Sequence, residues 1–276
     1  MGSSIGIFDS GYGGLTIFDK IQKNLPQYDF TYLGDNARAP YGTRSFEVVY
    51  HFTRQAVMTL LDQGCRLIIL ACNTASAKAL RNIQQKDIPM LDPSLRVLGV
   101  IRPTVEAIDN ISLTKHVGVM GTTGTISSQS YNIEISHLFP HITVTGEACP
   151  MWVPLVENNE FDSPGADYFV RKHIEHILSV DPRIDTLILG CTHYPLLRNK
   201  IKTFLPQGVA LFSQGEQIAG SLKDYLLRHP EIDSRLTKQG RRRFLTTEAA
   251  DKFSETASIF LHQAIAVEQI TLSENK

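Results

Sequence analysis

Two cysteines occupy matching positions in an internal repeat of this sequence. The segment LIILACNT (67–74) lines up with TLILGCTH (186–193), so Cys72 and Cys191 each follow a short apolar run. The segment IGIFDSG (5–11) lines up in the same way with VGVMGTT (117–123). A repeat of this kind is what a duplicated α/β unit leaves in a sequence. We therefore expect two related halves, each with a thiol at an equivalent place.

The residues around the two thiols favour acid–base chemistry. Each cysteine precedes small polar residues that suit the first turn of a helix, where the local positive potential favours a thiolate. A thiolate and a thiol on opposite sides of a small substrate could take a proton from one face of a carbon and return one to the other. This chemistry inverts the carbon without a cofactor. Asp9, which ends the first apolar run, and His193, which follows Cys191 by two residues, could relay protons for the two thiols.

Hydroxyl, amide and backbone N–H groups near the same runs could bind carboxylates. They belong to Ser10, Asn73, Thr74, Thr122, Thr125 and Thr192. The alternative for either cysteine alone is a small side chain that fills the core at the end of a strand. That alternative accounts less well for a pair that recurs with matched neighbours. Cys65 and Cys149 have no such match, and we interpret them as packing residues.

The elements that must position these residues alternate between short apolar runs and longer helix-like stretches. This alternation predicts an α/β fold with mainly parallel sheets. Most of the runs lack polar residues at every second position, which is typical of strands covered by helices on both faces. Both cysteines fall at strand carboxyl ends, where open α/β sheets bind ligands. The predicted strands are 5–8, 30–33, 67–70, 97–101, 117–120, 141–144, 187–189 and 209–212, and the predicted helices are 45–63, 75–85, 129–138, 167–179, 196–204 and 251–267.

The composition is that of an ordinary globular protein. A length of 276 residues suits two domains or one large one, and 42% hydrophobic with 20% charged residues argues against disorder. A net charge of −1 gives no support to a broad nucleic-acid surface. No apolar run approaches the roughly 18 residues of a membrane span, and the first residues lack the features of a signal peptide. Four cysteines without a Cys-x-x-Cys pair favour free thiols in the cytoplasm.

Four separated motifs closely resemble the glutamate racemases, a family of the cofactor-independent aspartate/glutamate racemase superfamily. These motifs are FDSGxGGL (8–15), GDxARxPYG (34–42), ACNTA (71–75) and GCTHYPL (190–196), and the segments VPLVE (153–157) and FLTT (244–247) are also similar. The resemblance covers residues 5 to 262 and implies two α/β domains with the substrate in the cleft between them. We expect residues 1–100 and 212–276 to form the N-terminal domain, and 101–211 to form the second, inserted domain.

The resemblance also implies roles for individual residues. Cys72 would accept the α-proton of the D-isomer and Cys191 that of the L-isomer, with Asp9 and His193 as their respective auxiliaries. Glu157 would be a further auxiliary near the second thiol, although Glu160 lies close to it in the sequence. The implied activity is the interconversion of L- and D-glutamate, and bacteria build the D-isomer into peptidoglycan. The implied substrate contacts are Asp9, Ser10, Tyr41, Gly42, Asn73, Thr74, Thr125, Thr192 and His193.

Two segments carry expectations of their own. Residues 90–96 look like an insertion relative to the family pattern, and we expect this segment to cross between the domains. The basic run 238–243 leads into the β-prone segment 244–247, which predicts a solvated edge strand. The insertion leaves the catalytic motifs intact. We therefore expect any effect of it to be on domain closure, on an oligomer interface or on a regulatory contact.

Other kinds of site fit less well. The segment GYGGLT (11–16) lacks the third glycine of a dinucleotide-binding loop. Cys-x-His at 191–193 lacks partners at structural-zinc spacing, so we expect no metal and no cofactor. A Cys/His amidase would leave the repeat unexplained, because it needs one nucleophilic thiol. A two-lobed amino-acid-binding protein would have no need of facing thiols.

The preference for glutamate over aspartate rests on the resemblance. The two substrates differ by one methylene, which is worth only about 1–3 kcal/mol in a pocket. We expect a small-molecule substrate as the partner, with neither nucleic acid nor membrane. The oligomeric state is not readable from the sequence, and a homodimer stays open.

Overall fold

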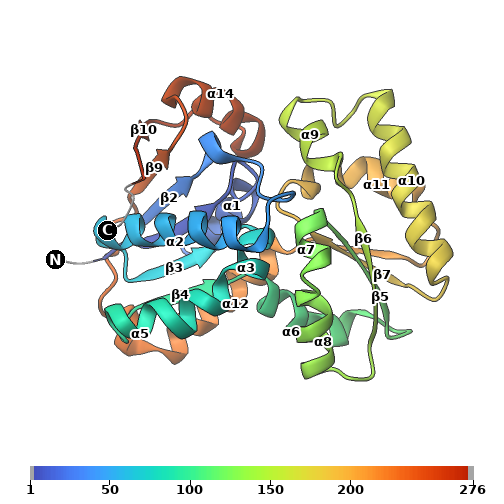
Figure 1. Ribbon diagram of the computed structural model, residues 1–276, viewed down its shortest axis with the longest axis horizontal. Helices are drawn as coiled ribbons and strands as arrows, with labels where there is room; N and C mark the ends of the chain where they lie inside the picture. Colours follow the sequence, from blue (N-terminus) through green and yellow to red (C-terminus); the bar gives the residue numbers. More distant parts are fainter. Residues whose placement is uncertain (1–2, 273–276) are drawn as a thin grey trace.

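The computed structural model describes residues 3–272 and contains two β-sheets, each built from parallel strands only (Figure 1). Residues 1–2 and 273–276 lie outside the described residues. They are the two ends of the predicted N-terminal domain, and residues 1–2 also begin the segment for which we expect no signal peptide. The larger sheet has the order β10-β9-β2-β1-β3-β4 and the smaller sheet the order β6-β5-β7-β8. The strands are β1 (Ile5–Asp9), β2 (Phe30–Gly34), β3 (Leu67–Leu70), β4 (Arg96–Gly99), β5 (His116–Gly121), β6 (Thr143–Ala148), β7 (Thr186–Gly190), β8 (Ala210–Phe212), β9 (Arg242–Thr246) and β10 (Val267–Gln269).

The strand order repeats between the two sheets. In each, the first strand of the half lies between the second and the third, and the fourth lies outside the third, as in β2-β1-β3-β4 and β6-β5-β7-β8. This arrangement confirms the predicted α/β fold with parallel sheets. It also places Cys72 and Cys191, which lie just after β3 and β7, at equivalent positions. The boundary between β1 and β3, or β5 and β7, is the switch point at which such sheets bind ligands.

Helices cover the sheets and explain the apolar strands. Every residue of β1, β2, β3 and β7 is buried. Local sequence sets several helix starts: Ser45 accepts a hydrogen bond from the backbone of Val48, and Ser163 caps a helix that begins with Pro164. The helices are α1 (Leu15–Asn24), α2 (Phe46–Asp62), α3 (Asn73–Lys78), α4 (Leu80–Asn82), α5 (Ile88–Leu91), α6 (Ile101–Ile111), α7 (Thr123–Ser127), α8 (Ser130–Leu138), α9 (Trp152–Glu157), α10 (Pro164–Val180), α11 (Arg198–Phe204), α12 (Gly215–Arg228), α13 (Pro230–Asp233) and α14 (Ala250–Leu261), with 3₁₀ turns at Asn36–Arg38 and Tyr194–Leu197 and a π-helical turn at Ile83–Asp87.

Aromatic side chains fix the helices that carry the site. Phe18 of α1 packs edge-on against Phe30 and Phe244, with ring centroids 5.6 and 5.5 Å apart. In the other half, the fully buried Trp152 at the start of α9 lies 4.8 Å from the ring of Tyr194. This contact holds α9 against the segment that follows β7.

The chain passes between the two halves twice. It leaves the larger sheet after β4, runs through α6 and enters the smaller sheet at β5. After β8 it returns through α12, which packs against α1 and also contacts α6. Figure 1 shows α12 behind the larger sheet and α14 beside β9 and β10, so the C-terminal segment lies with the N-terminal strands. The residue numbers of the predicted domain boundaries stay a prediction.

Several expectations about single elements are wrong. Residues 90–96 do not cross between the halves: they end α5 and lead into β4, which pairs with β3. The strand predicted at 244–247 is not an edge, because β9 pairs with β2 on one side and with β10 on the other. The predicted helix 251–267 ends at Leu261, and β10 follows. The helices α1, α6 and α12 were not predicted.

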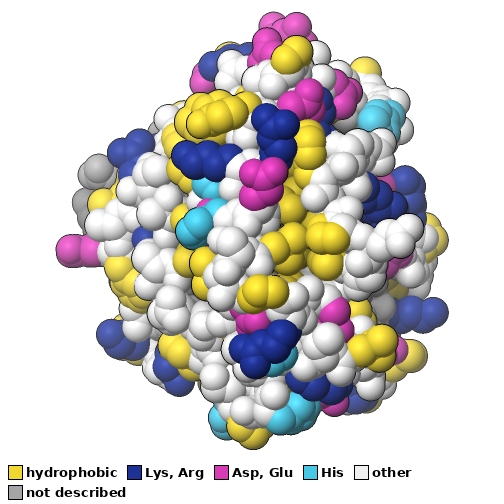
Figure 2. Space-filling view, turned by 90° about the vertical axis from the view of Figure 1, so that its right-hand side faces the viewer, with side chains coloured by type: hydrophobic (Ala, Val, Ile, Leu, Met, Phe, Trp, Pro, Cys, Tyr) yellow, Lys and Arg dark blue, Asp and Glu magenta, His cyan; other side chains and the backbone are white. Residues whose placement is uncertain are grey.

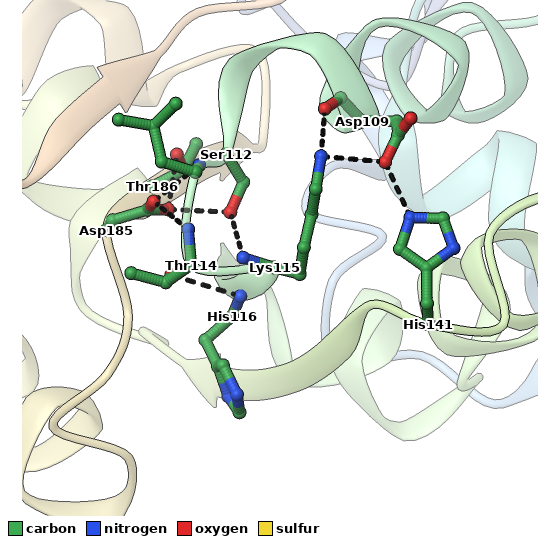
Figure 3. Close-up of polar contacts among 9 residues, drawn as sticks. Asp109, Ser112, Thr114, Lys115, His116, His141, Asp185 and Thr186 are labelled. Carbon is green, nitrogen blue, oxygen red and sulfur yellow. Dashed lines mark hydrogen bonds and ion pairs between the residues drawn. The ribbon is translucent and has the colours of Figure 1, made fainter.

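A polar cluster closes the end of the smaller sheet that lies away from the cysteines (Figure 3). Asp185, just before β7, accepts hydrogen bonds from the hydroxyl of Ser112 at 2.7 Å and from the backbone N–H of Thr114 at 2.7 Å. Asp109 accepts from Lys115 at 2.9 Å and from His141 at 2.7 Å. Each carboxylate is thus matched by donors from the chain itself, as expected of a structural cap.

The face formed by the smaller sheet and its helices carries mixed charges. Figure 2 shows Lys and Arg side chains interspersed with Asp and Glu, without a broad patch of one sign on this face. Over residues 3–272, no helix combines the length and the apolar character that a membrane crossing needs.

Candidate active site

The carboxyl ends of the two sheets enclose a cavity of about 130 Å³. An engineered cavity of about 150 Å³ holds one benzene molecule, so the volume suits a single small molecule. Both repeat cysteines line it, one from each sheet. The full lining consists of Ser10, Gly11, Ala39, Pro40, Tyr41, Gly42, Thr43, Cys72, Asn73, Thr74, Thr122, Thr123, Pro150, Val153, Pro154, Glu157, Cys191, Thr192 and His193.

Cys72 follows β3 and caps α3. Its sulfur accepts a hydrogen bond from the backbone N–H of Ala75 at 3.4 Å and lies 3.2 Å from the hydroxyl of Ser10. Burial and the nearby charge of Asp9 raise the pKa of the Cys72 thiol to about 12, against the opposing effect of these two hydrogen bonds. Cys72 is therefore a thiol at neutral pH.

Asp9 ends β1 and is completely buried. One carboxylate oxygen accepts a hydrogen bond from the backbone N–H of Gly11 at 3.0 Å, while the other has no hydrogen-bond partner in the described part of the chain. Burial raises the pKa of Asp9, although the charge of His193 and the N–H groups of Gly14 and Gly11 oppose this rise. Asp9 is thus a buried carboxyl group that lies against the loop 11–14, outside the lining of the cavity.

Cys191 follows β7 and belongs to a chain of three side chains. Its sulfur lies 3.9 Å from Nδ1 of His193, and Nε2 of the same ring lies 2.9 Å from a carboxylate oxygen of Glu157 on α9. Burial alone would lower the pKa of His193, but hydrogen bonds to Cys191 and Glu157, and their charges, raise it to about 10. At neutral pH, His193 is therefore an imidazolium whose two N–H groups donate to the sulfur and to the carboxylate.

The glycines of the first loop make room for this machinery. A Cβ on Gly14 would lie 2.5 Å from the Cβ of Asp9, and one on Gly13 would lie 2.3 Å from Nδ1 of His193. The same Gly13 Cβ would meet the hydroxyl of Thr192 at 2.3 Å. The glycines that resemble a dinucleotide loop thus allow the side chains of Asp9, Thr192 and His193 to approach the backbone.

Hydroxyl groups join the two halves beside the cavity. Thr74 at the start of α3 lies 2.9 Å from Thr122 and 3.2 Å from Thr125, measured between hydroxyl oxygens. Gly42 accepts a hydrogen bond from the backbone of Gly124 at 2.7 Å. These contacts seat the rim of the larger half on the first turn of α7.

Tyr41 reaches the cavity with its ring fixed from behind. Its hydroxyl donates to Asp35, which also accepts from Nε of Arg38 at 2.7 Å and from the hydroxyl of Thr247 at 2.9 Å. The peptide bond between Ala39 and Pro40 is cis. The hydrogen bonds to Asp35 hold the loop between β2 and α2 as one wall of the cavity.

Most of the predicted site residues come together in this cavity, although their roles stay predictions. Ser10, Tyr41, Gly42, Thr74, Thr192 and the other lining residues named at the sequence level surround it, whereas Asp9 and Thr125 lie behind the lining. Glu157 contacts His193; Glu160 does not line the cavity. The apolar wall formed by Pro150, Val153 and Pro154 was missed, although the VPLVE motif could have indicated it.

The described residues include no group of three or more His, Cys, Asp and Glu side chains that could hold a metal ion. Among the side chains that line the cavity there is no Lys or Arg. A negatively charged ligand would therefore be bound by hydroxyl, amide and backbone N–H groups and by the His193 imidazolium.

Comparison with known proteins places these features in one family. The family model described as Asp/Glu/Hydantoin racemase matches residues 5–214. A glutamate racemase from Ruegeria sp. (strain TM1040) is 41% identical over 275 residues, which cover 96% of this chain and 99% of that protein. A glutamate racemase from Shouchella clausii (strain KSM-K16) is 40% identical over 263 residues, covering 95% and 91%.

Solved structures agree with the sequence comparisons. The crystal structure of glutamate racemase isoform RacE1 from Bacillus anthracis is similar with a TM-score of 0.89 and 36% identity, covering 98% of each chain. The glutamate racemase of Francisella tularensis subsp. tularensis SCHU S4, crystallised in complex with D-glutamate, gives a TM-score of 0.88 at 33% identity, covering 99% of each chain.

Proposed function

The chain belongs to the Asp/Glu/hydantoin racemase family and is an amino-acid racemase, and we propose that its substrates are L- and D-glutamate. The substrate assignment is supported by relatives of about the same length that carry the name glutamate racemase, and by a similar structure with D-glutamate bound. The observation that carries the mechanism is that two thiols, at equivalent strand ends of two repeated sheets, line one cavity of single-molecule size.

We infer a two-thiol mechanism. With D-glutamate bound, the Cys72 thiol first passes its proton to the neighbouring Asp9, whose own pKa is raised by burial. The resulting Cys72 thiolate takes the α-proton, so the C–H bond breaks and its electron pair stays on the substrate, delocalised into the carboxylate. The Cys191 thiol then gives its proton to the opposite face of the α-carbon, which yields L-glutamate and a Cys191 thiolate. The reverse reaction exchanges these roles. No electrons are transferred to or from the enzyme, so the step needs no redox cofactor.

The surroundings of the two thiols differ, which suits different auxiliaries. His193 as an imidazolium stabilises negative charge on the neighbouring sulfur and on the substrate, and Glu157 keeps this ring charged. Asp9 lies buried near Cys72 and raises the pKa of its thiol, so it is placed to relay a proton there. We assign Asp9, His193 and Glu157 as auxiliaries and retain Asp9 and Thr125 among the proposed substrate-binding residues.

The remaining assignments follow from this activity. We propose that the N-terminal domain comprises residues 1–100 and 212–276 and the second domain residues 101–211, a division supported by the points at which the chain changes sheet. We further propose that the enzyme works in the cytoplasm and supplies D-glutamate for peptidoglycan. Rescue of a bacterial strain that requires D-glutamate for growth tests this role directly.

The decisive experiment incubates the protein with L-glutamate in deuterium oxide. Loss of the α-proton NMR signal together with loss of optical activity supports racemisation, and L-aspartate run in parallel tests substrate choice. Cys72→Ser and Cys191→Ser should each abolish inversion, whereas the matched control Cys65→Ser, a buried thiol outside the cavity, should retain it. If the protein causes no exchange and no racemisation with L-glutamate or L-aspartate, the proposed function is ruled out. Full activity in a Cys72 or Cys191 variant rules out the two-thiol mechanism.

A further inference from the structure

A buried polar network links the cavity to the segment that returns from the smaller sheet. Gln214 lies between β8 and α12, and its side chain is almost fully buried, at 3% exposure. Its amide contacts Asn73 of α3, which lines the cavity, together with Tyr131 of α8 and Thr104 of α6. All three partners are buried as well. The network therefore joins the larger half to helices that belong to the smaller one.

The hydrogen-bond directions in this network follow from one backbone carbonyl. The hydroxyl of Thr104 donates to the carbonyl oxygen of Val100 at 2.7 Å, so its oxygen can only accept from Gln214. The Nε2 group of Gln214 must therefore face Thr104, at 2.7 Å, and Tyr131, at 2.6 Å. A helix carbonyl cannot be flipped, and it thus determines the orientation of the Gln214 amide.

The same logic fixes the amide of Asn73. With Nε2 of Gln214 facing Thr104, its Oε1 faces Asn73 and accepts from Nδ2 at 2.8 Å. The oxygen of Asn73 accepts from the hydroxyl of Tyr131 at 2.7 Å. It also lies 3.3 Å from Nε2 of Gln214, whose two N–H groups already face the closer oxygens of Thr104 and Tyr131. The oxygen of Asn73 and one of its two N–H groups are thus engaged within the network. The second N–H is what this side chain retains for a ligand.

We propose that Gln214 is a positioning residue that holds Asn73 as a hydrogen-bond donor to a carboxylate oxygen of the substrate. Without this network the Asn73 amide could turn its oxygen toward the cavity, where it would repel a carboxylate. The inference rests on the proposed function, since it assumes that the ligand of this cavity is an acidic amino acid. It adds a residue outside the cavity lining to the machinery that selects the substrate.

Replacing Gln214 with Glu tests the polarity of the network with almost no change in shape. A carboxylate offers no N–H to Thr104, and Tyr131 would turn its proton toward the new charge and leave the oxygen of Asn73 with one donor fewer. We expect the KM for L-glutamate at pH 8 to rise about tenfold, which corresponds to about 1.4 kcal/mol, with a much smaller change in kcat. A buried carboxyl resists ionisation, and its protonated form again has a donor. The KM of the variant should therefore recover on lowering the pH to 6.

Three further measurements separate positioning from mere packing. In an Asn73→Ala background, Gln214→Glu should raise KM no further, because the effect acts through Asn73. Gln217→Glu is the matched control, because it makes the same change three residues later, where the side chain contacts Ser221 of α12. It should leave KM and kcat as in the wild type. Thr104→Val removes the acceptor that orients Gln214 and should raise KM by about threefold, a fraction of a hydrogen bond's usual contribution.

The outcomes distinguish this inference from the proposed function. Failure of the wild-type protein to racemise glutamate overturns both. Racemisation by the wild type, with an unchanged KM in Gln214→Glu at every pH, overturns the positioning role alone. So does an additive rise in KM in the Asn73→Ala background. If Gln214→Glu does not fold, Thr104→Val decides: a higher KM supports the inference and a wild-type KM overturns it.

Discussion

The charge on His193 predicts how the stability of the fold depends on pH. The pKa of His193 rises from its ordinary 6.5 to about 10, because Cys191 and Glu157 outweigh the effect of burial. Between these two values the folded state holds one proton more than the unfolded state. The free energy of unfolding must therefore fall as the pH rises, by at most about 1.4 kcal/mol per pH unit. This contribution is complete below pH 6.5 and is lost as the pH passes 10.

The range from pH 7 to 9 contains about half of this effect. Over it, the linked loss amounts to about 2.5 kcal/mol of the roughly 5 kcal/mol that corresponds to the whole shift. From about pH 8 the raised pKa values of Cys65, Cys72 and Cys149 add losses of the same sign, because unfolded thiols begin to ionise there while the buried ones do not. Urea unfolding at several pH values within the range measures the slope, and NMR of the His193 ring gives its pKa directly.

Glu157→Gln is the informative variant, since it removes the carboxylate 2.9 Å from the ring. Its pH slope should be clearly shallower than that of the wild type. Glu47→Gln removes the partner of His51 in an exposed pair and should leave the slope unchanged. A wild-type free energy that stays constant from pH 7 to 9, or a His193 ring that titrates near 6.5, would refute the proposed Cys191–His193–Glu157 arrangement.

Three other substitutions test the packing that supports the site. Gly13→Ala places a methyl group 2.3 Å from His193 and Thr192 and should lower kcat/KM at least about tenfold by displacing His193. The control Gly220→Ala, in the open interior of α12, should stabilise the fold by about 1 kcal/mol in urea unfolding. A fully active Gly13→Ala variant would contradict the argument. Asp35→Ala leaves Arg38 and the buried Tyr41 hydroxyl without their acceptor and should cost about 3–5 kcal/mol in urea unfolding, so a loss below 1 kcal/mol would count against the buried pair. Trp152→Ala removes a fully buried ring that packs against Tyr194 and should lower the free energy of unfolding by about 3–5 kcal/mol in urea unfolding. The KM should also rise, because α9 carries Glu157. Unchanged stability would contradict the packing role of the ring.

The repeat around the cysteines predicted two related α/β halves with a thiol at an equivalent place in each, whereas Tyr41, Gly42 and Glu157 were named only through the resemblance. An apolar run such as Leu67–Leu70 is typical of a strand that is buried on both faces, so this strand could be predicted from its own residues. Since parallel strands end at one edge, the residues after them could be expected to meet. Helices α1 and α12 were missed although their buried residues recur at helical spacing, as Leu15, Phe18 and Ile21 do in α1. Each buries this face against the other, a contact that only the tertiary structure shows. The internal position of β9 depended on β10, which adds a strand from the far end of the chain.

The identity of the candidate acid–base residues could thus be predicted from the sequence, whereas their pKa values depend on the tertiary structure. Cys72, Cys191 and His193 were recognisable from their neighbours, since a thiol at a strand end is a local feature. Burial and the charge of Asp9 raise the pKa of Cys72, whereas Cys191 and Glu157 raise the pKa of His193 against the effect of burial. Asp9 and Glu157 are far away in sequence from the residues on which they act. Gln214 carried no local signal, because a polar residue before Gly215 and Glu216 also suits an exposed helix start. Only folding brings its amide to Asn73, 141 residues earlier in the chain, and turns a surface-like residue into part of a buried network.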